Sequence, residues 1–78
     1  MPDDKIVTIE TRTFFMVSRR FNAMKKRGAF NEMVLADLNF ELEFLIGSTE
    51  CVALRQSCIQ ISGRIEDQIA WLRSAEAV

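Results

Sequence analysis

The sequence predicts an all-α fold of three helices joined by short loops, in which the last helix is long and amphipathic. The main observation is an apolar repeat, in which hydrophobic side chains recur every three or four residues among mostly polar neighbours. The repeat consists of Cys51, Leu54, Cys58, Ile61, Ile65, Ile69 and Leu72. In addition, only three glycines and one proline interrupt the chain, which leaves few places for helices to end.

The first segment supports a helix over residues 6–27, with a strand as the alternative for residues 5–11. β-Branched and aromatic residues between Ile6 and Val17 suit a strand. At ~100° per residue, however, the apolar side chains of this segment gather on one side of a helix. They are Ile6, Val7, Phe14, Val17, Phe21 and Met24. Gly28 follows three basic residues, which is typical of a helix C-terminus.

The second helix is predicted over residues 29–46 and the third over residues 48–75. Gly47 suits the end of one helix, and Ser48 suits the N-cap of the next. The second helix has two apolar faces, so we expect it to lie in the middle of the bundle. The broad face contains Val34, Leu35, Leu38, Leu42, Leu45 and Ile46, and the narrow one contains Met33, Phe40 and Phe44. The repeat of the third helix spans roughly 80°, as in a coiled-coil seam.

The chain is predicted to form one domain, 1–78, with more apolar surface than a single copy can bury. Hydrophobic residues make up 49% of only 78 residues, and a small domain has a high ratio of surface to volume. We therefore expect dimerisation, as a homodimer, or a partner protein to complete the core.

The termini and cysteines favour a cytoplasmic protein, and the size suggests a bacterial or phage source. Residues 1–5 lack the basic and apolar pattern of a signal peptide, and no apolar run approaches the ~20 residues of a membrane span. On one helix, Cys51 and Cys58 would lie ~10 Å apart, too far for a disulfide within the chain. We expect both thiols to pack in the seam as apolar groups, and the main alternative is a disulfide between subunits.

The composition argues against catalysis, a cofactor or a metal site. The chain contains neither histidine nor tyrosine, which removes the most common general base near neutral pH. Two thiols alone make a poor zinc site, and thiols in an apolar seam are unreactive. No glycine-rich phosphate loop is present. We therefore expect a protein that is not an enzyme.

Four large side chains are candidates for contact with another protein: Met33, Phe40, Phe44 and Trp71. The first three form the narrow face of the second helix, and Trp71 lies ~140° or more from most of the seam. Aromatic residues and methionine outside a core are typical of interfaces. The alternative is that the chain's own packing, or a self-dimer, buries them.

Basic residues gather on one side of the predicted first helix, opposite its apolar side: Arg12, Arg19, Arg20, Lys26 and Arg27. The simplest interpretation is a solvated outer face, with the last cations stabilising the helix C-terminus. Such a stripe also steers an acidic partner or follows nucleic-acid phosphates. The net charge of −1 and the lack of an interleaved exposed aromatic weaken the nucleic-acid interpretation. A membrane surface is disfavoured because the core needs the same apolar side.

The order of these segments resembles that of the ribbon-helix-helix repressors. The resemblance consists of a strand at Lys5–Arg12, a helix to Arg27, the turn at Gly28 and a helix over residues 30–46. It implies a dimer that places paired strands in the DNA major groove.

Together, the observations predict a small, non-enzymatic, helical protein-binding regulator that occupies the surface of a partner protein as an adaptor, chaperone or inhibitor. The alternative is a dimeric nucleic-acid-binding transcriptional regulator, either ribbon-helix-helix-like or helical, that uses the basic stripe of residues 12–27.

Overall fold

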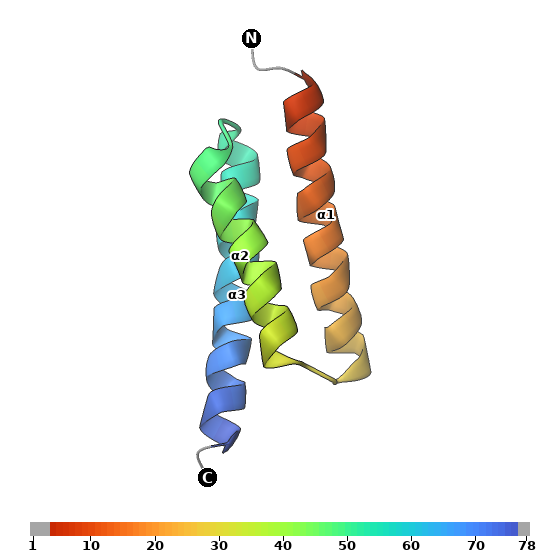
Figure 1. Ribbon diagram of the computed structural model, residues 1–78, viewed down its shortest axis with the longest axis vertical. Coiled ribbons are helices and arrows are strands. Elements are labelled where there is room, and N and C mark those ends of the chain that lie inside the picture. The colour runs from red at the N-terminus through yellow and green to blue at the C-terminus, as the bar shows by residue number, and fades with distance from the viewer. Residues whose placement is uncertain (1–3, 77–78) are drawn as a thin grey trace.

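The computed structural model describes residues 4–76, which form three helices: α1 (Asp4–Arg27), α2 (Glu32–Ser48) and α3 (Val52–Glu76). Successive helices run in opposite directions, so the two ends of the chain lie at opposite ends of an elongated bundle (Figure 1). The bundle measures 52 × 21 × 17 Å. The predicted all-α fold of three helices is therefore confirmed.

Residues 5–11 are helical, so the strand considered for them is wrong. The resemblance to ribbon-helix-helix repressors depends on that strand and fails at this point. On α1, Val17 and Phe21 are buried, and Phe14 and Met24 pack against the same core. The apolar helical period thus prevails over the strand preference of the β-branched residues. The side chains of Ile6 and Val7, predicted to share this face, lie outside the described part.

The first loop begins after α1 where predicted, but α2 begins later in the sequence than predicted. Gly28 has a φ of 66°, and its N–H donates to the Lys25 carbonyl at 3.2 Å. The chain then passes through an extended Asn31, whose side-chain oxygen accepts from the N–H groups of Met33 and Val34 at 2.9 and 3.2 Å. This N-cap fixes the start of α2 at Glu32 rather than at residue 29.

The second loop lies two residues beyond the predicted break at Gly47. Gly47 and Ser48 continue α2, and the Ser48 hydroxyl donates to the Phe44 carbonyl at 2.8 Å. Thr49 caps the end of α2 with its N–H, and its hydroxyl accepts from the N–H of Cys51 at 3.2 Å. Ser48 therefore does not cap α3 as predicted. Thr49 forms the hydrogen bonds of this turn instead.

The core lies along α2 and takes side chains from all three helices. Its buried members are Val17, Phe21, Leu35, Leu38, Leu42, Leu45, Leu54, Cys58 and Ile65. Cys51, Ile61, Ile69 and Leu72 pack against this cluster, so the whole predicted repeat of α3 contributes to the core. The four leucines of the broad apolar face of α2 are buried, whereas Ile46 is half-buried and Val34 is 39% exposed.

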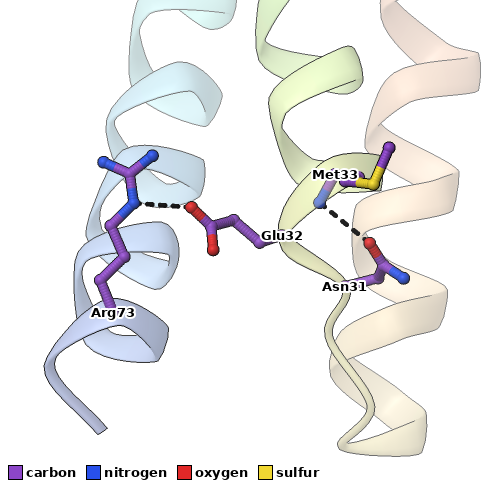
Figure 2. A network of polar contacts seen from close by, with 4 residues as sticks. All are labelled: Asn31, Glu32, Met33 and Arg73. Atoms are coloured by element: carbon purple, nitrogen blue, oxygen red, sulfur yellow. Dashed lines mark hydrogen bonds and ion pairs between the residues drawn. The ribbon is translucent and has the colours of Figure 1, made fainter. Parts of the chain in front are cut away.

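Polar contacts tie α2 to α3 along its length. The Ser62 hydroxyl donates to the Asn39 side chain at 2.5 Å. Figure 2 shows the second contact, in which Arg73 donates to Glu32 at 2.6 Å. Arg55 donates to the backbone carbonyl of Ile46 at 3.1 Å and to that of Thr49. Among the described side chains of α1, from Ile9 onward, none forms such a hydrogen bond to another helix. Val17 and Phe21 of α1 join the shared core through apolar contacts.

None of the three helices, as described, combines the length and the hydropathy that crossing a membrane requires.

Candidate protein-binding surface

A groove of about 490 Å³ lies between the N-terminal half of α1 and the C-terminal half of α2. In Figure 1 these two halves stand apart at the same end of the bundle. The residues that line this α1–α2 groove are Ile9, Glu10, Thr13, Phe40, Glu41, Phe44, Leu45 and Ser48. A smaller hollow of about 250 Å³, lined by Thr13, Met16, Val17, Arg20 and Glu41, continues from it. Thr13 and Glu41 line both, so the two form one depression along the α1–α2 boundary.

Helical spacing explains which side chains form the walls. On α1, Ile9, Thr13 and Met16 follow one another at intervals of four and three residues, so they lie on one face. On α2, Phe40 and Phe44 are four residues apart and lie on one face in the same way. These two faces border the line along which α1 and α2 meet, beside the buried leucines.

The apolar walls of the α1–α2 groove face solvent. Phe40 is 70% exposed, Phe44 is 69% exposed and Ile9 is 63% exposed. Met33, at the start of α2, is also exposed. The predicted narrow apolar face of α2 is therefore not covered by the chain's own core. Apolar side chains gathered in a hollow are a common mark of an interaction site.

Charged side chains lie at different positions along this apolar depression. Glu10 and Glu41 line the α1–α2 groove, and Arg20 lines the smaller hollow. Among the described residues, the one ion pair joins Glu32 to Arg73 and involves none of these three. Behind the groove, burial and, to a lesser extent, the Glu10 carboxylate raise the pKa of the Cys58 thiol. The thiol therefore stays protonated and acts as an apolar core group.

Trp71 is exposed but does not belong to the groove. It lies two residues before Arg73, or ~200° around α3, and so points away from the contact between Arg73 and Glu32. The four predicted contact residues therefore separate into Phe40 and Phe44 in the groove, Met33 beyond its end, and Trp71 on another helix.

The five predicted basic residues Arg12, Arg19, Arg20, Lys26 and Arg27 are all exposed. One detail of the sequence analysis is wrong here, because an aromatic side chain does lie among them. Phe15 is 58% exposed and stands four residues before Arg19, hence beside it on the helix surface. The basic stripe therefore includes an apolar element that the sequence analysis left unassigned.

Ile9 and Met16, which line the α1 side of the depression, were not among the contact residues predicted from the sequence. The signal was present in the sequence as the spacing of Ile9, Thr13, Met16 and Arg20 along one helix face. The strand alternative for residues 5–11 concealed it, because Ile9 has no fixed face until that segment is known to be helical.

The chain has no match among protein-family models, curated proteins or solved structures.

Proposed function

We propose that this chain is a small, non-enzymatic, helical regulator that acts by binding another protein through the α1–α2 groove. The observation that carries the proposal is the exposure of Phe40, Phe44 and Ile9 on the walls of the α1–α2 groove. Leaving these apolar side chains in water is unfavourable, and a protein surface that covers them recovers that free energy.

An α-helix is the element that best fits such a site. A long, shallow, apolar depression between two helices accepts the apolar face of a third, as in helix-in-groove recognition. Phe40 and Phe44 then act as anchors, for which truncation to alanine typically costs ~2 kcal/mol or more of binding free energy. The exposed arginines on α1 increase the association rate with an acidic partner.

The free thiols of Cys51 and Cys58 support a reducing, cytoplasmic location for this activity. Met33 and Trp71 are additional contact points outside the groove, exposed for the same partner or for another.

The experiment is capture of binding proteins from a lysate of the source cell with wild-type chain and two phenylalanine variants as bait. Phe44→Ala removes a groove side chain, whereas Phe15→Ala removes a similarly exposed one from the outer side of α1 and is the matched control. We expect Phe44→Ala to lose the bound protein and Phe15→Ala to keep it. Equal loss in both variants, or in neither, contradicts the proposal.

A nucleic-acid-binding regulator is the second candidate, and Phe15 among the arginines is the observation that favours it. Exposed aromatics beside basic side chains provide stacking surfaces for single-stranded bases. Binding of this kind weakens steeply with salt and disappears when Arg19 and Arg20 become alanine. Filter binding of a single-stranded oligonucleotide at two salt concentrations tests it, and salt-independent or undetectable binding rejects it.

A further inference from the structure

We propose that the helix that fills the α1–α2 groove is α1 of a second copy of this chain, related to the first by a two-fold axis across the middle of α1. The inference narrows the proposed function by naming the bound protein as a second copy of this chain, and it rests on that function because it requires the groove to bind a protein helix. In this arrangement the two α1 helices run antiparallel, and each lies between α1 and α2 of the other copy. The two α1–α2 hairpins then pack face to face as four helices, and α1 keeps its contact with α2 within each copy.

The exposed apolar area of the depression matches that of a dimer interface. Phe40 and Phe44 each leave about 140 Å² uncovered if the whole side chain is about 200 Å². Ile9 and Met16, 63% and 52% exposed, add roughly 200 Å² more. Each copy thus offers roughly 500 Å² of apolar area, close to the apolar share of the ~800 Å² that each partner buries in a standard interface.

The spacing along α1 suits direct contact between two α1 helices. Ile9, Met16 and Ala23 recur every seven residues, which is the repeat of a coiled-coil seam. All three are exposed. An antiparallel pairing about Met16 places Ile9 of one copy opposite the small Ala23 of the other. Large and small side chains then alternate along the contact, and the two backbones can approach closely.

Charge fixes the direction of this pairing. Glu10 and Arg20 lie at opposite ends of the depression, ten residues or ~15 Å apart along α1. A two-fold axis between them exchanges the ends, which brings Glu10 of one copy within reach of Arg20 of the other, twice in each dimer. A parallel pairing would instead place like charges together. Neither residue forms an ion pair within the described chain, so both are available.

The test is sedimentation velocity of the full chain over a concentration series in reductant, with circular dichroism to verify folding. We expect the wild type to be a dimer. Phe44→Ala should weaken dimerisation at least ~30-fold, whereas the matched control Phe15→Ala should change it less than about threefold. A monomeric wild type at all concentrations, or a dimer that Phe44→Ala leaves unchanged, overturns the inference.

A charge exchange tests the antiparallel geometry separately. Glu10→Arg and Arg20→Glu should each weaken the dimer at low salt, and the double variant E10R/R20E should recover it because the opposite charges meet again. A double variant weaker than both single variants overturns the arrangement. A wild-type monomer that captures another protein only while Phe44 is intact refutes self-association and leaves the proposed function standing. A monomer whose protein binding is indifferent to Phe44 refutes both.

Discussion

Leu42 and Phe44 lie two residues apart on α2, and truncating each to alanine tests how the helix divides between core and groove. Leu42 is 0% exposed and Phe44 is 69% exposed. Leu42→Ala removes buried atoms and leaves a cavity, for which the unfolding free energy falls by about 2–5 kcal/mol. In a chain of this size, that is a large share of the total stability.

Phe44→Ala should cost much less. About 60 Å² of the Phe44 side chain is covered, which at ~25 cal/mol per Å² corresponds to roughly 1.5 kcal/mol. The higher helix propensity of alanine returns about 0.5 kcal/mol, so the expected net loss is about 1 kcal/mol.

The assay is urea unfolding followed by circular dichroism, at the lowest protein concentration that gives a signal so that self-association contributes little. An unchanged slope with denaturant verifies that both variants unfold from a comparable folded state. If Phe44→Ala destabilises the chain as much as Leu42→Ala, then Phe44 belongs to the core and the groove does not exist as described.

Two further predictions concern the cap of α2 and the buried thiol. Asn31→Ala should lower the unfolding free energy by ~1 kcal/mol because it leaves two backbone N–H groups of α2 without an acceptor; Asn22→Ala, in the exposed middle of α1, is the control and should not destabilise. In native protein, a thiol reagent should modify Cys51 before the fully buried Cys58, and equal rates would contradict the packing of α3. Burial raises the pKa of Cys58 in the folded state above its ordinary value of 9.0. The stability that the protonated thiol contributes is therefore fully present below pH 9.0 and is lost as the pH rises through the pKa of the folded state. Cys58→Ala should lack this loss.

The buried faces of α2 and α3 could be predicted from the sequence because they depend only on the helical period of the apolar residues. The repeat from Cys51 to Leu72 fixes which face of α3 is apolar, and the leucines of α2 do the same for its buried face. Gly28 was identified correctly because cations followed by glycine specify a helix C-terminus whatever the tertiary contacts are.

The helix junctions and the groove could not be predicted in the same way. Asn31 starts α2 through two hydrogen bonds, whereas the sequence predicted a start at residue 29, directly after the glycine that ends the first helix. Glycine is common at helix ends, so Gly47 was predicted to end the second helix. It lies inside α2 instead, because the turn after α2 forms at Thr49. The groove depends on where the first half of α1 stands relative to α2, which is a property of packing rather than of either helix alone.

The central claim is that a protein helix occupies the α1–α2 groove, and photocrosslinking from position 44 tests it most directly. The photoreactive p-benzoylphenylalanine replaces Phe44 in one variant and Phe15 in a matched one, and adducts made in the source cell are identified by mass spectrometry. We expect a protein adduct from position 44 that maps to α1 of a second copy, with little from position 15. An absence of protein adducts from position 44, or equal labelling from both positions, would contradict it.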